Sequence, residues 1–258
     1  MSQLLDIDHI RVSYGEKNII SDINFSVEGG EFCALLGLNG SGKTTLLRAV
    51  CGLLKEEKGR ITVAGKCLSP MNEYQRAKLL SYIPQRSSDM NGVTVLDVVL
   101  MGLNPHLRLL ETPSQKQREQ AVRLLDRAGL SGYENHDFDK ISGGQKQLAI
   151  FARALLQDAP VMLMDEPDSA LDFVNRNIVL SRIKNAVHEK KKAGLITLHE
   201  PNFALAYCDR LLLMKSGTIV GDIKLKDESN EEIKQGLSLI YGNVDLLEHK
   251  GKRLIVAC

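Results

Sequence analysis

The sequence predicts an α/β fold that combines a core of alternating strands and helices with an antiparallel β region and a mainly helical insert. Short strand patterns alternate with helical ones in both halves of the chain, a glycine-rich loop joins a buried strand to a helix, and a long helical stretch interrupts the alternation. We expect one domain over residues 1–226, with the helical insert at about 86–158, and a short C-terminal appendage over 227–258.

The first third of the chain has the spacing of strands. Apolar and polar residues alternate from Ile10 to Tyr14 and from Ile23 to Val27, with a turn at Gly15 between them. Residues 32–36 are continuously apolar, as in a strand buried on both faces. The next predicted elements are a helix at 43–53 and strands at 60–63 and 80–83.

The pattern becomes helical after residue 85. It stays helical from 93 to 130, with Thr94 and Ser114 as N-caps and Gly129 as a stop. The remaining predicted elements are helices at 146–156 and 175–192, strands at 161–164, 195–198, 210–214 and 218–223, and a short helix and a hairpin in the appendage.

Composition limits the possible partners. Lys and Arg total 33 against 32 Asp and Glu, so the chain lacks the basic excess that binding to nucleic acid usually requires. The apolar runs are far shorter than the roughly 20 residues that span a bilayer. A role at a membrane would therefore require docking onto a spanning protein.

The five cysteines are scattered and form no CxxC pair. This pattern favours buried or free thiols over zinc ligands or disulfides, and it indicates a reducing cytoplasm.

The strongest motif is GxxxxGK[ST], placed between a predicted strand and a predicted helix. Its residues are Gly37, Leu38, Asn39, Gly40, Ser41, Gly42, Lys43 and Thr44. The glycines let backbone N–H groups face phosphates, and the helix N-terminus adds partial positive charge. Lys43 can reach the β- and γ-phosphates, and the Thr44 hydroxyl can bind Mg²⁺. The motif predicts a phosphate-binding loop.

A second motif ends the predicted strand at 161–164 with two carboxylates. Asp165 is placed to hold Mg²⁺, and Glu166 to orient or deprotonate an attacking water. An Asp-Glu pair alone would be an ordinary start of a surface loop. Following a phosphate-binding loop in an α/β chain, it favours catalysis.

A third motif precedes the helix predicted at 146–156. It consists of Ser142, Gly143, Gly144 and Gln145. A small hydroxyl and two glycines at a helix N-terminus form an anion site, although alone they would be an ordinary helix cap.

These motifs, in this order, resemble those of the ATP-binding subunits of ABC transporters, over about residues 5–223. The resemblance implies a P-loop NTPase core, with ATP and Mg²⁺ as its ligands. For the nucleotide, it assigns Tyr14 to stacking on adenine, Thr45 to the ATP-binding loop and His199 to the γ-phosphate. Gln85 is assigned to Mg²⁺ and the membrane partner. Residues 142–145 are assigned to the signature motif, and Ser169 and Asp172 to the dimer interface. Without the resemblance, the alternatives are a core tyrosine for Tyr14, a solvated loop residue for Gln85 and a structural histidine for His199.

The resemblance also implies a mechanism. Two copies pair head to tail, each ATP lying between the phosphate-binding loop of one copy and the signature helix of the other. Hydrolysis at Glu166 separates them, and the motion passes to an integral membrane permease fed by a substrate-binding protein. The chain would then act at the cytoplasmic face of the membrane as a peripheral subunit.

Residues 93–106 resemble the helical region of importers for iron chelates, haem, vitamin B12 and related oxoanions. By pattern alone they form an amphipathic core helix, and the subunit of an ABC exporter would carry the same motifs. The cargo stays undefined, because in this family the ATPase does not touch it.

Two positions depart from the family pattern. Asp168 stands where Thr is common, and it would either raise the pKa of a neighbouring carboxyl or face solvent. After His199, Glu200-Pro201-Asn202 replaces the more frequent Asp-Leu-Asn.

Other ATPase and GTPase classes fit less well. Soluble ABC-type ATPases of DNA repair or translation usually carry coiled coils, zinc modules or fused cassettes, and none is visible here. A GTPase would need an NKxD motif, which Asn185 and residues 190–192 do not supply; we interpret that Lys-rich run as a solvated helix end.

Overall fold

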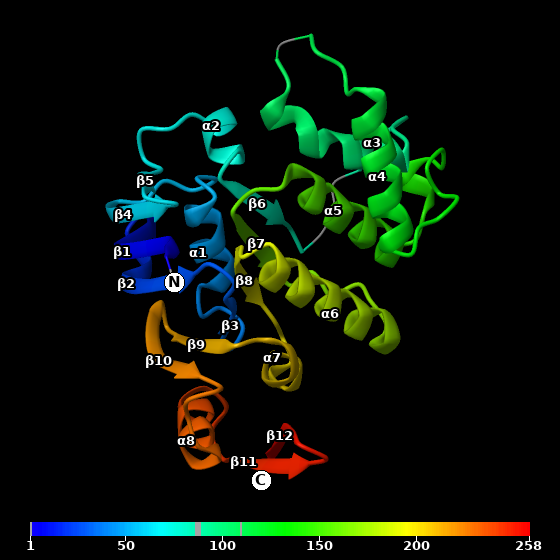
Figure 1. Ribbon diagram of the computed structural model, residues 1–258. Coiled ribbons are helices and arrows are strands. Elements are labelled where there is room, and N and C mark those ends of the chain that lie inside the picture. Colours follow the sequence, from blue (N-terminus) through cyan, green and yellow to red (C-terminus); the bar gives the residue numbers. More distant parts are fainter. Residues whose placement is uncertain (1, 86–88, 109) are drawn as a thin grey trace.

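A computed structural model describes residues 2–85, 89–108 and 110–258. Its centre is a six-stranded sheet in the order β10-β9-β3-β8-β7-β6, in which only β10 is antiparallel to its neighbour (Figure 1). The strands are β3 (Phe32–Leu36), β6 (Leu80–Ile83), β7 (Val161–Asp165), β8 (Ala193–Thr197), β9 (Arg210–Lys215) and β10 (Thr218–Lys224).

A smaller antiparallel sheet, in the order β2-β1-β4-β5, lies on one side of α1 (Figure 1). Its elements, with the helices nearby, are β1 (Gln3–Tyr14), β2 (Lys17–Glu28), β4 (Lys58–Val63), β5 (Lys66–Cys67), α1 (Lys43–Val50) and α2 (Glu73–Ala77).

A helical segment connects β6 to β7. It contains α3 (Val95–Leu100), the 3₁₀ helices η1 (Met101–His106) and η2 (Phe138–Lys140), α4 (Gln115–Arg127) and α5 (Gly143–Gln157). Thr94 and Ser114 are N-caps as predicted, and each also forms a capping box, while Gly129 stops the helical stretch with φ +82°. The predicted start of the insert at residue 86 lies outside the described residues.

The last elements are α6 (Phe173–Glu189), α7 (Pro201–Tyr207), α8 (Asn230–Tyr241) and the hairpin β11 (Val244–His249) and β12 (Lys252–Ala257). The predicted helix and hairpin of the appendage are both present. Ile233, Leu237 and Ile255 bury their side chains in the main core, so these elements pack onto the domain.

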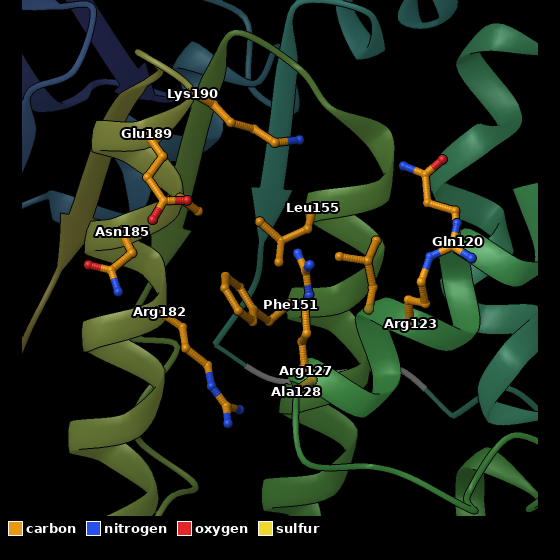
Figure 2. Close-up of a pocket in the computed structure, with 12 residues that line it drawn as sticks. Gln120, Arg123, Arg127, Ala128, Phe151, Leu155, Arg182, Asn185, Glu189 and Lys190 are labelled. Carbon is orange, nitrogen blue, oxygen red and sulfur yellow. The ribbon is translucent and has the colours of Figure 1, made fainter.

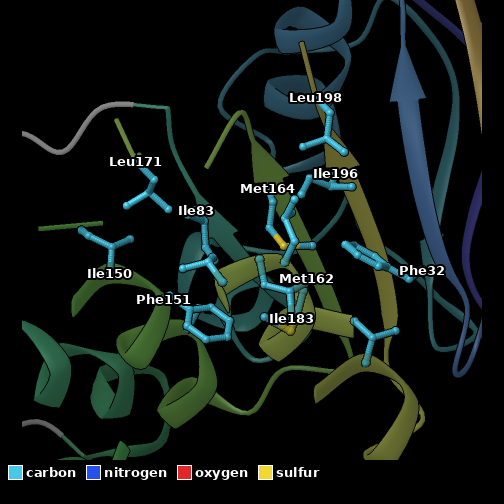
Figure 3. Close-up of a cluster of buried hydrophobic side chains, with 14 of the residues drawn as sticks. Phe32, Ile83, Ile150, Phe151, Met162, Met164, Leu171, Ile183, Ile196 and Leu198 are labelled. Carbon is cyan, nitrogen blue, oxygen red and sulfur yellow. The ribbon is translucent and has the colours of Figure 1, made fainter. Parts of the chain in front are cut away.

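The central sheet has one hydrophobic core on each face, and the alternation of side chains along each strand creates both. In β3, Phe32, Ala34 and Leu36 join the core with α5 and α6 (Figure 3), whereas Cys33 and Leu35 join the core beneath α1. Burial on both faces explains why these strands are continuously apolar.

Several predicted boundaries were wrong. The helix at 43–53 ends at Val50, because Gly52 takes a φ of +75° and its N–H bonds the carbonyl of Ala49. The helix at 175–192 runs from Phe173 to Glu189, since Asp172 caps it. Helix α2 was missed, because its five residues are too few to show a helical periodicity.

The interpretation of residues 190–192 as solvated holds for Lys190 and Lys191, which are exposed, but was wrong for Lys192. The Lys192 side chain is buried, and its Nζ donates to the carbonyl of Ala159 at 2.6 Å and contacts Asp158 Oδ1 at 2.8 Å. Paired in this way, the charge can be buried.

None of the helices in the described ranges combines the length and apolar character needed to cross a bilayer.

We expect Phe32→Ala to lower the free energy of unfolding by about 3–5 kcal/mol, because it leaves a cavity beside Gly194 in a fully buried position. Denaturant titration measures this loss. Phe173→Ala is the control: its ring is 73% exposed, so its effect should stay below about 1 kcal/mol. Equal losses in the two variants would contradict the assignment of the core.

Candidate functional site

The predicted site residues meet along one edge of the central sheet. The glycine-rich loop follows β3, Gln85 follows β6, Asp165 and Glu166 end β7, and His199 follows β8. These four strands are adjacent and parallel, so their carboxyl ends lie together. Parallel pairing is what brings together residues more than 150 positions apart.

The glycine-rich loop is shaped around an open centre. Gly40 and Gly42 have φ of +79° and +108°, which other residues rarely adopt. Lys43 Nζ donates to the carbonyls of Gly37 at 2.8 Å and Leu38 at 3.3 Å, across the loop. Ser41 Oγ is buried without a hydrogen-bond partner among the described residues. An unpaired hydroxyl and a cation at the start of α1 suit a phosphate group.

Asp165 is held by hydroxyl groups. Its Oδ1 accepts from Thr197 Oγ1 at 2.9 Å and from Thr44 Oγ1 at 3.2 Å, and its Oδ2 accepts from the Tyr82 hydroxyl at 3.4 Å. Burial, and secondarily the Asp165 charge, raises the pKa of Tyr82 to about 12, so this hydroxyl remains a donor at neutral pH. Asp165 and Thr44 thus present adjacent oxygen ligands, the type that Mg²⁺ prefers.

Glu166 occupies a strained backbone position, with φ +47°. Its N–H donates to Thr197 Oγ1 at 2.9 Å. Its Oε2 lies 2.5 Å from Gln85 Nε2 and 2.7 Å from His199 Nε2. The carboxylate is therefore buried and held from two sides, as a positioned general base requires.

Lys43 supplies the positive charge of the site. Burial lowers the pKa of its ammonium group, and the carboxylates of Glu166 and Asp165 partly oppose that shift. A phosphate would provide a charge partner for the ammonium group, which forms no ion pair with any residue that the structure describes.

Lys43, Thr44 and Glu166 line a polar cleft of about 560 Å³, whereas Asp165 does not. The lining residues are Tyr14, Lys17, Ile19, Asn39, Gly40, Ser41, Gly42, Lys43, Thr44, Thr45, Gln85, Glu166 and His199. The Tyr14 side chain is 50% exposed at the rim, so the core alternative for it was wrong. Leu38 is 55% exposed and Gly37 is half-buried; neither lines the cleft.

The motif at residues 142–145 caps α5. Ser142 Oγ accepts from the N–H of Gln145 at 3.3 Å, and Gln145 Oε1 accepts from the N–H of Ser142 at 2.9 Å. These residues line a second cavity of about 510 Å³, together with Ala170, Leu171 and Asp172. The second cavity shares no lining residue with the polar cleft.

Asp172 has a local role that the sequence pattern did not indicate. Its Oδ1 accepts from the N–H of Asn175 at 2.8 Å and so begins α6. Ser169, three residues earlier, is exposed in the loop after β7.

Two residues beside Asp165 were missed, Thr197 and Tyr82. Thr197 lies within the apolar run at 195–198, and Tyr82 within the strand at 80–83. A hydroxyl near the end of a buried strand that adjoins the strand of Asp165 could have indicated both.

Asp168 does not face solvent, so that alternative was wrong. Its side chain is 5% exposed, and its Oδ2 lies 3.1 Å from Arg176 Nε. Burial raises the pKa of this carboxyl, which the Arg176 charge partly opposes.

A separate cavity of about 430 Å³ lies between α4, α5 and α6 (Figure 2). Phe151 and Leu155 from α5 lie between Arg123 and Arg127 of α4 and Arg182 of α6. None of the predicted site residues lines it.

The family model described as ABC transporter matches residues 20–169. A probable iron chelatin transport ATP-binding protein of Helicobacter pylori strain 26695 is 33% identical over 98% of this chain and 99% of its own length. The hemin import ATP-binding protein HmuV of Shewanella denitrificans is 35% identical over 84% of this chain and 86% of its own.

Solved structures with the same fold agree. A metal-chelate type ABC transporter in an inward-facing conformation has a TM-score of 0.81 and 26% identity, covering 98% of this chain and 96% of its own. The dimeric bacterial ABC transporter cassette MJ0796 has a TM-score of 0.79 and 25% identity, covering 86% of this chain and 99% of its own.

Proposed function

This chain belongs to the ABC transporter family, and we propose that it is the ATP-hydrolysing subunit of a membrane importer for a metal chelate, haem, cobalamin or similar cargo. Two similar proteins support the cargo class: one is named for iron chelatin transport and the other for hemin import. A third, of Bacillus anthracis, is named for petrobactin import and is 30% identical over 90% of this chain.

The observation that carries the proposal is that the glycine-rich loop and the N-terminus of α5 line two separate cavities. The polar cleft offers Lys43 and the glycine-rich loop, whereas the N-terminus of α5 lies in a cavity with no lining residue in common. We infer that ATP bound in the cleft of one copy is completed by residues 142–145 of a second copy. Ser169 and Asp172, beside the second cavity, would lie at the interface between the copies.

ATP therefore favours association, because its γ-phosphate offers negative charge to the free N–H groups that begin α5 of the partner copy. ADP lacks that group, so hydrolysis weakens the contact. The chain would therefore form a homodimer that closes when ATP binds and opens after hydrolysis.

We assign hydrolysis to Glu166. Its carboxylate accepts a proton from the attacking water, whose oxygen forms a bond to the γ-phosphorus as the bond to the β-phosphate oxygen breaks. His199, 2.7 Å from the same carboxylate, holds it and faces the γ-phosphate, and Tyr14 at the cleft rim stacks on adenine.

The side chains fit a magnesium ion. Thr44, Asp165 and the amide oxygen of Gln85 would hold it, with the phosphates as further ligands. When bound, Mg²⁺ neutralises charge on the β- and γ-phosphates.

We further propose that the chain docks at the cytoplasmic face of a membrane, on integral permease subunits that receive cargo from a substrate-binding protein. In this arrangement residues 1–226 form the ATPase domain, the helical segment to residue 158 contacts the permease beside Gln85, and 227–258 form an appendage.

The first test is purification of the tagged chain from gently solubilised native membranes, with partners identified by mass spectrometry. We expect a polytopic permease of the metal-chelate class. Recovery of an exporter permease would overturn import, and recovery with ribosomes or DNA would overturn transport.

Asn104→Arg should reduce permease recovery several-fold, because Asn104 is exposed on η1 within the proposed docking segment. Asn243→Arg, in the exposed turn before β11, is the matched control and should leave recovery unchanged. Equal recovery with both variants would place the docking site elsewhere.

A further inference from the structure

The two departures from the family pattern, Asp168 and Glu200, share a partner in the structure. Arg176 of α6 lies between them: its Nε is 3.1 Å from Asp168 Oδ2, and its Nη1 is 3.5 Å from Glu200 Oε2. The contact with Asp168 is an ion pair whose geometry does not form a hydrogen bond. The guanidinium also lies 5.1 Å from the centre of the Phe203 ring, on α7.

Each of the two carboxylates belongs to a loop that carries a site residue. Asp168 comes two residues after Glu166, and Glu200 directly follows His199. Arg176 thus connects the loop after β7 to the start of α7, while Glu166 and His199 contact each other at 2.7 Å. The same two segments are joined at two places.

We propose that Arg176 is a positioning residue for ATP hydrolysis, bridging Asp168 and Glu200 so that Glu166 and His199 keep their mutual geometry. The inference rests on the proposed function, in which Glu166 is the general base. A loop with a strained residue such as Glu166 needs support from its surroundings, and a small misplacement of a catalytic group lowers the rate strongly.

The burial of Asp168 supports a functional purpose. Because the pKa of Asp168 is raised in the folded state, its carboxyl binds a proton more tightly there than in the unfolded chain. The folded state therefore loses stability as the pH rises from the unfolded-state pKa through the folded-state pKa. At neutral pH the charged Asp168 therefore does not stabilise the fold on its own. Asp168→Thr should leave the melting temperature at pH 7 unchanged or higher.

The test is a double-mutant cycle on the complex with its permease, using Arg176→Gln, Asp168→Thr and the double variant. We expect Arg176→Gln to lower kcat about tenfold with KM for ATP within about twofold, because it leaves Asp168 buried without its cation. The double variant, in which the bridge is also absent, should be no slower than Arg176→Gln alone, and Arg176→Lys should recover part of the loss. Arg182→Gln, on the same helix and without an ion pair in the described part of the chain, should match wild type.

An unchanged kcat for Arg176→Gln, a change in KM alone, or losses that multiply independently in the double variant would each overturn the proposal. A second readout does not depend on activity. The imidazole NMR signal of His199, assigned with His199→Gln, should shift in Arg176→Gln while that of His106 stays in place; an unmoved His199 signal would also overturn it. If the wild-type complex does not hydrolyse ATP, the proposed function fails, and the His199 signal still tests the bridge.

Discussion

Glu166→Gln is expected to lower the rate of ATP hydrolysis by about 10²–10⁴-fold while leaving ATP binding intact. An amide has nearly the shape of the carboxylate but cannot accept the proton of the attacking water. Its oxygen can still accept hydrogen bonds from Gln85 and His199, so the site should keep its shape. The rate of phosphate release measures hydrolysis, and size-exclusion chromatography in MgATP detects retained ATP binding through the dimer that it favours.

Because the γ-phosphate is retained, Glu166→Gln should accumulate as a dimer in MgATP and remain monomeric in MgADP. Glu189→Gln, an exposed position near the end of α6, is the control and should hydrolyse ATP like wild type. A variant that binds ATP yet stays monomeric would contradict the shared site, and one that hydrolyses at the wild-type rate would remove Glu166 from the base role.

Lys43→Met is expected to weaken ATP binding by about 10²-fold. It therefore acts at the binding step, whereas Glu166→Gln acts at the later hydrolysis step. The substitution removes the buried cation of the phosphate-binding loop, and each charge-assisted hydrogen bond to a phosphate is worth about 1.5–3 kcal/mol. Isothermal titration calorimetry with MgATP measures the change. Lys66→Met, exposed on β5, should bind like wild type.

The pH dependence gives a further check on Lys43. Burial lowers the pKa of its ammonium group, so the group loses its charge at a lower pH than an ordinary lysine does. As the pH rises, the affinity of the wild-type chain for ATP should therefore begin to fall early. Lys43→Met should lack that component. An unchanged dissociation constant in this variant would place the phosphates outside the loop.

The local elements could be predicted because their causes are local. The continuous apolar run of β3, the N-caps at Thr94 and Ser114, and the hairpin of the appendage all follow from spacing over a few residues. Element ends were less predictable: α1 stops at Val50 because of a turn, and the short helix α2 shows little periodicity.

Sequence alone determined the class of protein and the chemistry of its main motif. The loop at 37–44, Asp165 and Glu166 at the end of β7, and residues 142–145 are each recognisable from a few consecutive residues. Only the tertiary structure decided which side chains surround them. Thr197 holds Asp165, and Arg176 joins Asp168 to Glu200, because parallel strand pairing and the packing of α6 bring distant segments into contact. Such contacts depend on the arrangement of whole elements in space, which no short stretch of sequence specifies.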